Sequence, residues 1–504
     1  MLLRELKSIE KTGSGYILHG DAADVLLIFM TDDVIRVRVS FRRDFKEESY
    51  TLVTTAWEDR MDELLKDERT RIEPLDIPFE EKNGKLVFTT GACILEIRKT
   101  PFFLTLKTLD GAVVYQDLKE RAFEEDHLGR LAHYSKMDPV NDHFYGFGEK
   151  TGCLDKKGRR LRMSPKDAIG HDPEFGDPMY KHIPFYIRIN EKTAYAIGLF
   201  YHNSYDSVFD MGQEVSGYWD RYCYYQTDGG DIDLFLINGP ELSAVLDRYT
   251  MLTGRCALPT KQSLGYCAST MYYAELEDNC DQEIYRVIDK HEKEGILIDN
   301  FWLASGYSSG EEDNLRYIFN WNYRRFPNPE DFFERMNARG INVIPNLKPG
   351  ILKNHPYMNL FEENGVFIKN PGGDGDYYGR WWGGEGRFLD FTNPKARETW
   401  KMLLEDRILR MGTKTVWNDN CEMDGAGLGA SGCVSWQFDK KGVIIMESEG
   451  LDEDAVMMQA LDAGAEDFLV EEGVFEIYTA PDDFSTVREA LEKEGYTFAQ
   501  AELQ

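Results

Sequence analysis

Positive charge is scarce in this sequence. Lysine and arginine together number 58, against 89 aspartate and glutamate residues, which gives a formal net charge of −31 and a pI near 4.7. Nucleic acids and anionic membranes are repelled by such a chain, because they carry charge of the same sign. A neutral or cationic partner is easier to accommodate, and this favours an uncharged substrate such as a sugar.

Clustered metal-binding and redox motifs are also missing. The nine histidines form no H-x-H or H-E-x-x-H motif, and the eight cysteines form no C-x-x-C motif or paired spacing. Scattered cysteines are typical of reduced, mostly buried thiols, so we expect no disulfide framework, no metal site and no cofactor. The cysteines are Cys93, Cys153, Cys223, Cys256, Cys267, Cys280, Cys421 and Cys433.

Long hydrophobic runs are absent as well. No segment approaches the roughly 18 apolar residues of a membrane span. The opening MLLRELKSIEKTGSG has charges in its first apolar stretch and no apolar signal-peptide core, so we expect a cytoplasmic protein without membrane partners. With 504 residues, 42 % of them hydrophobic, the chain is long enough to form two to four domains.

The first half of the chain has the pattern of antiparallel sheet. Residues 35–41 alternate apolar side chains with Arg36, Arg38 and Ser40, as a half-buried strand requires. Asp110-Gly111 separates two apolar runs and favours a two-residue hairpin turn. We predict an N-terminal β-sandwich domain over residues 1–255.

From residue 256 to 424 the pattern changes to alternating strands and helices, which indicates a parallel sheet or barrel. The predicted strands are SLGYCAST, ILIDNFWL, INVIPNL and TKTVW. One predicted helix follows the first strand and ends at Gly295, and two others begin at Asn328-Pro329 and Asn393-Pro394, where Asn suits the N-cap and Pro the first helical position. These are four βα units.

The last eighty residues differ again, with eighteen acidic and only four basic side chains. Their pattern predicts a strand at VIIM, a helix over 452–464, strands around FLV and VFEIY, and a helix started by Thr479 and Pro481. We expect a separate small α+β domain over residues 425–504.

Asp419, in VWNDNCE, follows the fourth predicted strand of the barrel section. The carboxyl ends of parallel barrel strands meet on one face, so an acidic residue there can act on a ligand. Retaining glycoside hydrolysis needs one carboxylate as nucleophile and a second as acid and base. Asp419 suits the first role, although an acidic residue at this position can also serve only as a cap or a solvated loop residue.

Five segments occur in the order found in glycoside hydrolase family 31, which residues 140–424 resemble. They are FYGFGEKTG, DPMYKHIPFY, FNWNYRRFPNPEDFF, FLDFTNP and VWNDN. The resemblance implies a β-sandwich followed by a (β/α)₈ TIM barrel, and activity on α-linked glucose, galactose, xylose or sulfosugar substrates. It also implies that Asp419 is the catalytic nucleophile.

Other residues are carried over from the same resemblance. Trp417 and Trp382 match aromatics that line the sugar subsite, with core packing as the alternative. Asp167 matches an aspartate that reaches over the barrel mouth, with a turn-forming residue as the alternative. Where many family members have acidic residues, this chain has a segment beginning at Trp302, and Lys348 in the next loop. Trp302 is a candidate substrate contact, and Lys348 is either a ligand-facing cation or an exposed loop lysine.

The family's acid/base aspartate follows the sixth barrel strand, whereas this chain leaves the family pattern soon after the fourth. We therefore expect an incomplete (β/α)₈ barrel without the acid/base, impaired in catalysis and prone to self-association through its open edges.

The tail explains the break, because GLGASGCVSWQFDKKGVIIME and LDAGAEDFLVEEGVFEIYTAPDDFSTVREALEKEGYTFAQAEL resemble the middle-to-late part of the YebC/PmpR family of transcriptional regulators and translational activators. The tail lacks that family's basic N-terminal domain, which argues against nucleic-acid binding. Three hypotheses follow: a retaining α-glycosidase, a YebC-type regulator, or a non-catalytic carbohydrate-binding remnant.

Overall fold

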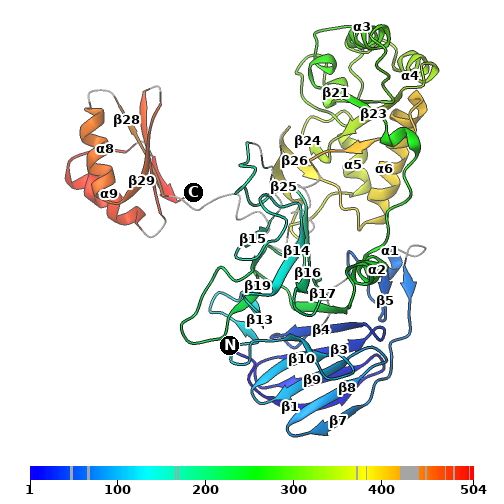
Figure 1. Ribbon diagram of the computed structural model, residues 1–504. Coiled ribbons are helices and arrows are strands. Elements are labelled where there is room, and N and C mark those ends of the chain that lie inside the picture. Colours follow the sequence, from blue (N-terminus) through cyan, green and yellow to red (C-terminus); the bar gives the residue numbers. More distant parts are fainter. Residues whose placement is uncertain are drawn as a thin grey trace. The chain divides into compact units, whose positions relative to one another are not determined.

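The chain divides into two compact units, Met1–Ala430 and Ser431–Gln504 (Figure 1). The computed structural model describes all residues except 46–48, 65–68, 165, 167, 169, 371–372, 382, 421–441, 449–450, 472, 481–482, 499 and 504. Within these described ranges, no helix has the length and apolar character needed to cross a bilayer.

The N-terminal part of the first unit is built on an eight-stranded antiparallel sheet. Two short strands, a one-turn helix and a longer helix accompany this sheet: β5 (Thr54–Thr55), β6 (Thr70–Arg71), α1 (Met61–Leu64) and α2 (Leu242–Thr253). The strands follow the order β1 (Leu6–Lys11), β2 (Tyr16–Gly20), β3 (Asp24–Phe29), β4 (Val34–Ser40), β20 (Ile232–Asn238), β17 (Tyr195–Tyr201), β16 (His182–Asn190) and β14 (Asp142–Gly148).

Two five-stranded antiparallel sheets share a core with the eight-stranded sheet. Val37 of β4, Leu95 of β9 and Tyr225 of β19 all belong to this core and are at most 1 % exposed. The first sheet has the order β11 (Val113–Gln116), β10 (Phe102–Lys107), β9 (Ile94–Lys99), β8 (Lys85–Thr89) and β7 (Phe79–Lys82); the second has the order β12 (Phe123–Glu125), β13 (Leu131–Lys136), β19 (Tyr222–Thr227), β18 (Ser207–Asp210) and β15 (Arg160–Met163). The predicted β-rich N-terminal domain is confirmed.

Strand β4 departs from the predicted half-buried alternation, because every one of its residues is buried. Arg36 is only 2 % exposed: its Nε and Nη2 atoms each donate a 2.7 Å hydrogen bond to the carboxylate of Asp233 on β20. Its guanidinium also lies 3.7 Å from the ring centroid of Trp57. Burial alone would raise the pKa of Asp233, but the charge and hydrogen bonds of Arg36 outweigh it and hold that pKa below its usual value.

The hairpin predicted at Asp110-Gly111 is present between β10 and β11, but its turn has three residues. Thr108 N–H bonds to Ala112 O at 2.9 Å, and Gly111 takes a φ of +91°. Such a three-residue loop places a glycine in the left-handed region, where a side chain is disfavoured.

The barrel section of the first unit contains a four-stranded parallel sheet in the order β21 (Cys267–Thr270), β22 (Asn300–Leu303), β23 (Asn342–Leu347) and β27 (Trp417–Asn418). Three helices connect these strands, as predicted: α3 (Cys280–Lys293), α4 (Pro329–Ala338) and α6 (Pro394–Arg407). Side chains of Asn328 and Asn393 cap α4 and α6 by accepting from main-chain N–H groups. The remaining elements are β24 (Gly350–Leu352), β25 (Tyr378–Trp381), β26 (Gly384–Phe388), α5 (Met358–Asn364) and the short 3₁₀ turns η1 (Lys261–Leu264), η2 (Tyr272–Ala274), η3 (Ser305–Ser308) and η4 (Leu409–Met411).

The second unit is a small α/β domain, as predicted. Its four antiparallel strands have the order β29 (Ala465–Glu471), β30 (Val474–Thr479), β28 (Gly442–Glu447) and β31 (Gln500–Leu503), and its helices are α8 (Glu453–Asp462) and α9 (Phe484–Lys493). This β-α-β-β-α-β order is the split β-α-β arrangement. The last strand, β31, was not predicted, and Pro481 of the predicted helix start lies outside the described residues.

The buried pair of Arg36 and Asp233 gives a prediction about the β-rich domain. Arg36→Met leaves the Asp233 carboxylate buried without its main partner, so we expect a loss of about 3–5 kcal/mol of local stability. Hydrogen exchange of the β4 and β20 amides in the full chain measures this loss. The matched control is Lys136→Met, which removes an exposed pair with Asp220 and should cost less than about 1 kcal/mol. Equal exchange in the two variants would contradict a stabilising role for the buried pair.

Candidate active site at the carboxyl ends of the parallel strands

Strand β27 brings Asp419 to the carboxyl end of the sheet. Its residues pair with β23, Trp417 beside Asn346 and Asn418 beside Leu347. The main-chain N–H of Asp419 continues the ladder with a 2.9 Å hydrogen bond to Leu347 O. Asp419 therefore lies one residue past its strand, level with the first residue after β23, which is Lys348.

Two side chains from β23 and its end bind the same oxygen of Asp419. Asn346 Nδ2 donates to Oδ2 at 3.0 Å, and Lys348 Nζ forms an ion pair with Oδ2. Lys348 Nζ also donates to Asn420 Oδ1 at 2.6 Å, while the N–H of Asn420 donates to Asp419 Oδ1 at 3.0 Å. Lys348 is only 8 % exposed, so it is not an exposed loop lysine.

Asn420 shapes the turn that follows Asp419. Its φ is +61°, a left-handed conformation in which asparagine is favoured over most other residues with a side chain. In this turn the Asp419 carboxylate and the Asn420 side-chain amide both contact the ammonium group of Lys348. Asparagine at this position thus supplies both the backbone conformation and an acceptor.

Trp302 and Trp417 pack against each other beside this carboxylate. Their ring centroids are 5.0 Å apart and their planes meet at 58°. Among the described residues, both indole N–H groups and Asn346 Oδ1 are buried without a hydrogen-bond partner. Buried polar atoms rarely lack partners, and these three belong to residues of the strands β22, β23 and β27.

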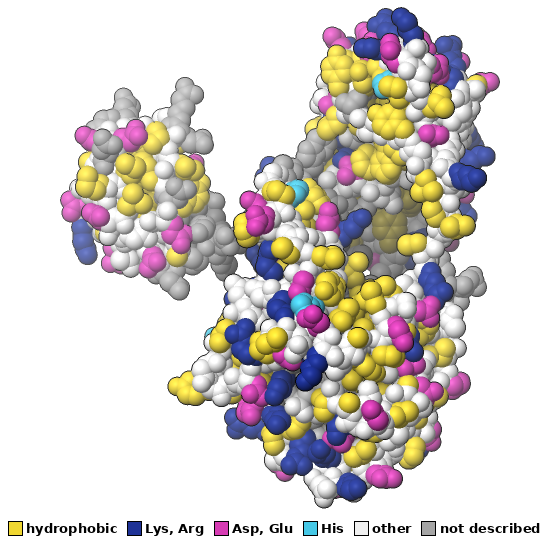
Figure 2. Space-filling view, viewed as in Figure 1, with side chains coloured by type: hydrophobic (Ala, Val, Ile, Leu, Met, Phe, Trp, Pro, Cys, Tyr) yellow, Lys and Arg dark blue, Asp and Glu magenta, His cyan; other side chains and the backbone are white. Residues whose placement is uncertain are grey.

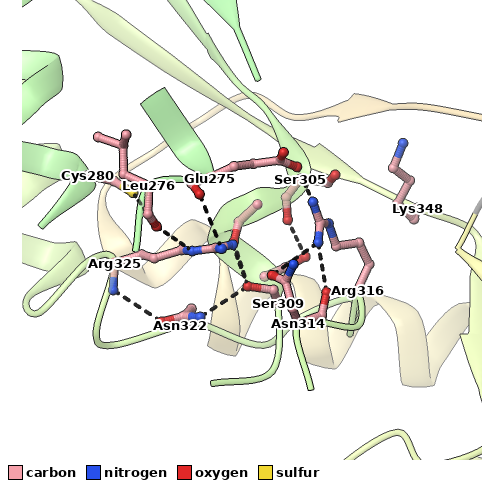
Figure 3. Close-up of polar contacts among 12 residues, drawn as sticks. Glu275, Leu276, Cys280, Ser305, Ser309, Asn314, Arg316, Asn322, Arg325 and Lys348 are labelled. Atoms are coloured by element: carbon pink, nitrogen blue, oxygen red, sulfur yellow. Dashed lines mark hydrogen bonds and ion pairs between the residues drawn. The ribbon is translucent and has the colours of Figure 1, made fainter. Parts of the chain in front are cut away.

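The loop after β22 is fixed by buried charges, as Figure 3 shows. Arg325 donates to Leu276 O and Gly306 O, both at 2.9 Å, and to Ser309 Oγ at 2.8 Å. Arg316, 8 % exposed, forms an ion pair with Glu275. These contacts tie the loop after β22 to the loop after β21.

Tyr307, in the same loop, supports the neighbouring strand β23. Tyr307 is fully buried, and its hydroxyl donates to Asn346 O at 2.7 Å. It therefore supports β23, the strand whose Asn346 side chain binds Asp419. Gly306 beside it has no room for a side chain, because a Cβ would lie 2.1 Å from Ala274 O. The Ser305-Gly306-Tyr307 segment is therefore a close-packed support for β23.

His355 holds the same loop from another side. Its Nε2 donates to Ile318 O at 2.9 Å, and its Nδ1 accepts from Tyr357 N–H at 3.1 Å. Burial lowers the pKa of His355 to about 4. The folded protein therefore keeps this ring neutral at pH values where an exposed histidine is protonated.

Four of the six residues predicted for the site lie together, namely Asp419, Lys348, Trp302 and Trp417. Asp167 and Trp382 lie outside the described residues. Sequence reasoning missed Asn346, Asn420, and the Glu275–Arg316 pair. An asparagine inside the apolar run INVIPNL was the available signal for Asn346, because a polar residue in a buried strand needs a partner.

The site contains a carboxylate, amide and ammonium donors, and a tryptophan pair. Within the described part of the chain, no group of three or more His, Cys, Asp or Glu side chains is placed to hold a metal ion. A carboxylate after a parallel strand, beside aromatic rings, can attack or bind a sugar. The β-rich domain, the parallel α/β section and a carboxylate at the strand ends together favour the class of glycosidases.

Comparisons with known proteins agree with this class. Residues 24–210 match the glycosyl hydrolase 31 N-terminal galactose mutarotase-like domain, and residues 256–458 match the glycosyl hydrolases family 31 TIM-barrel domain. Residues 416–504 match the TACO1/YebC second and third domain. The chain thus has the N-terminal and TIM-barrel domains of glycosyl hydrolase family 31, and a TACO1/YebC domain at its C-terminus.

Individual relatives cover parts of the chain. Alpha-glucosidase 2 of Bacillus thermoamyloliquefaciens is 29 % identical over 409 residues, which is 80 % of this chain and 47 % of that protein. A probable transcriptional regulatory protein of Acetivibrio thermocellus is 62 % identical over 81 residues, 16 % of this chain and 34 % of that protein. The structure of the Flavobacterium johnsoniae GH31 dextranase aligns with a TM-score of 0.70 at 20 % identity, covering 83 % of this chain and 48 % of that one. The chain thus spans about half the length of these glycosidase relatives.

His355 gives a prediction about pH. Between about pH 6.5 and 4 the unfolded state binds a proton at this residue that the folded state does not, so stability falls as the pH falls, by up to about 1.4 kcal/mol per unit. Denaturant unfolding followed by tryptophan fluorescence should show a smaller loss in His355→Gln. His127→Gln, at an exposed site, is the control and should behave like the unaltered chain. An unchanged pH dependence in His355→Gln would show that this histidine titrates normally.

Proposed function

We propose that this chain carries the nucleophile half of a retaining α-glycosidase, with Asp419 as the nucleophile. The observation that supports this most is the position of Asp419 at the end of β27, with one carboxylate oxygen bound by Asn346 and Lys348. In the proposed first step Asp419 attacks the anomeric carbon and forms a glycosyl ester while the leaving group departs.

The proposed substrate is a neutral α-glycoside. Lys348 and Arg316, two buried cations near the strand ends, are ion-paired with Asp419 and Glu275. Charges balanced within the protein suit an uncharged pyranose better than an anionic one. Relatives named alpha-glucosidase and alpha-xylosidase make glucosides and xylosides the first substrates to test.

We further propose that the barrel is incomplete and that this impairs catalysis. The described part of the barrel section contributes four parallel strands, and the chain passes into its TACO1/YebC domain where the relatives continue. No residue of this chain matches the family's acid/base. Loss of acid/base help typically slows catalysis by about 10² to 10⁴.

Asp419 gives the test of this function. A glycosyl fluoride needs no protonation, so the full chain should release fluoride from α-glucosyl or α-xylosyl fluoride in a burst of one equivalent and retain the sugar on Asp419. Aryl α-glycosides should react at least about 100-fold more slowly than with an intact relative. Peptide mass measurement locates the sugar. Asp419→Ala should abolish the burst, and labelling that survives this change would remove Asp419 from the nucleophile role.

The open edge of the sheet supports a second proposal, self-association. Strands β22 and β23 are mostly buried, whereas β21 has exposed residues at Cys267 and Ser269. Large apolar side chains nearby are exposed as well, including Leu264 at 75 % and Leu297 at 76 %. Figure 2 shows hydrophobic side chains at the surface of this part of the chain. Unpaired strand edges beside exposed apolar surface favour association.

Self-association can be measured directly. Light scattering should show oligomers or aggregates, and limited proteolysis should cut first between about residues 350 and 430 while the β-rich domain stays intact. Ser269→Lys, which adds a charge to the β21 edge, should reduce the association. A monodisperse monomer that resists protease through this region would contradict the proposal.

The tail supports an alternative role as a YebC-type regulator fragment. Its 62 % identity to a probable transcriptional regulatory protein favours this reading, whereas its acidic composition argues against nucleic-acid binding. A carbohydrate-binding remnant is the remaining alternative, and sugar binding without a fluoride burst would support it. We also infer a cytoplasmic location from the scattered spacing of the cysteines in the sequence, which is typical of reduced thiols.

A further inference from the structure

Two side-chain donors, from β23 and from the residue that follows it, converge on one oxygen of Asp419. Asn346 Nδ2 and Lys348 Nζ donate hydrogen bonds to Oδ2 of Asp419, while its Oδ1 accepts one from the main-chain N–H of Asn420. A nucleophilic carboxylate must direct one particular oxygen at the anomeric carbon, and a rotation about its χ2 bond would spoil that alignment. Two donors on Oδ2 oppose this rotation.

Lys348 is the more constrained of these donors. Its ammonium, on a side chain that is 9 % exposed, also binds Asn420 Oδ1 at 2.6 Å. It therefore connects the carboxylate of Asp419 with the side chain that follows it. Asn420 is itself 8 % exposed and has a φ of +61°, so the ammonium holds both the carboxylate and the turn that presents it.

We propose that Lys348 is a positioning residue that acts through Asp419 and does not contact the sugar. The proposal rests on the proposed role of Asp419 as nucleophile. In the glycosyl fluoride reaction an Oδ1 electron pair forms the bond to the anomeric carbon, the C–F bond breaks, and fluoride leaves with its electron pair. No proton moves, and the Lys348 ammonium stays on Oδ2 throughout.

The alternative is that Lys348 binds the substrate, and kinetics separate the two roles. A positioning residue changes the rate constant at saturation, because the bound sugar meets a misaligned carboxylate. A substrate contact changes the concentration needed for half-saturation, because binding itself is weakened. The fluoride burst reports both quantities.

The experiment compares variants of the full chain with α-glucosyl fluoride. Lys348→Met should lower the burst rate constant at saturation by about 10- to 100-fold. The half-saturating concentration should stay within about twofold, because Lys348, which clamps the Asp419 carboxylate, does not touch the sugar in this proposal. Lys348→Arg keeps the charge and should recover part of the lost rate. The control is Lys353→Met, at an exposed position in the following segment, which should leave both quantities unchanged.

Two kinetic results would overturn the proposal. A higher half-saturating concentration with an unchanged rate constant in Lys348→Met would make Lys348 a substrate contact. Unchanged values of both would deny it any role in the reaction.

A second measurement separates this proposal from the function of Asp419. A carbodiimide activates carboxylates and joins them to amines in direct contact, with loss of the activating group as a urea. Peptide mass analysis of the intact chain should find an amide between Lys348 and Asp419, and Asp419→Asn should abolish it. A burst without this cross-link would overturn the positioning role of Lys348 and leave the nucleophile role of Asp419 intact. A cross-link without a burst would overturn the role of Asp419 as nucleophile. Lys348 would then contact Asp419 without contributing to catalysis.

Discussion

The candidate site depends on the short parallel pairing of β23 with β27. Two residue pairs and a main-chain hydrogen bond from Asp419 to Leu347 join these strands, and Thr413 and Thr415, just before β27, also bond to β23. The pairing sets Asp419 level with Lys348 and brings Trp417 to Trp302 on β22. A shift of β27 by one residue would turn Asp419 to the opposite face of the sheet. The clamp by Asn346 and Lys348 therefore fixes the register as well as the carboxylate.

The two halves of the first unit are stabilised differently. In the β-rich domain, three sheets close one core, and the charged Arg36 is buried because Asp233 and Trp57 surround it. In the barrel section, β21 is an edge strand of the four-stranded sheet and has exposed residues at Cys267 and Ser269. Parallel sheets are normally covered on both faces, so such an edge is a source of instability. The site thus belongs to the less protected half.

Local signals predicted much of the fold. Asn328 and Asn393 cap their helices as their Asn-Pro pairs indicated, because capping depends on neighbouring residues alone. Strand β4 was predicted at the right place but with the wrong burial, since Arg36 pairs with Asp233 on β20 and Arg38 with Asp231 just before it, almost 200 residues away. Long-range ion pairs of this kind leave no local pattern. The hairpin at Asp110-Gly111 was found with one more turn residue than predicted.

The candidate site was also predicted only in part, because some of its contacts join segments that are far apart in the sequence. Asp419 was predicted from its position after a strand, whereas Lys348, Trp302 and Trp417 came from the resemblance to family 31, and the structure brings the four together. Asn346 and the Arg316–Glu275 pair were missed, because their importance depends on contacts between loops. The resemblance of the tail to a second family was also readable from sequence, and the comparison with TACO1/YebC domains agrees with it.

The central claim is that Asp419 forms a covalent intermediate with an α-glycoside. The most direct test is the anomeric configuration of the product formed from α-glucosyl fluoride in the presence of azide, read by NMR. Attack of azide on a glycosyl ester of Asp419 gives the α-glycosyl azide, because two inversions restore the configuration. The account predicts this α product. A β-glycosyl azide would mean direct displacement on the substrate without an enzyme-bound intermediate, and would contradict it.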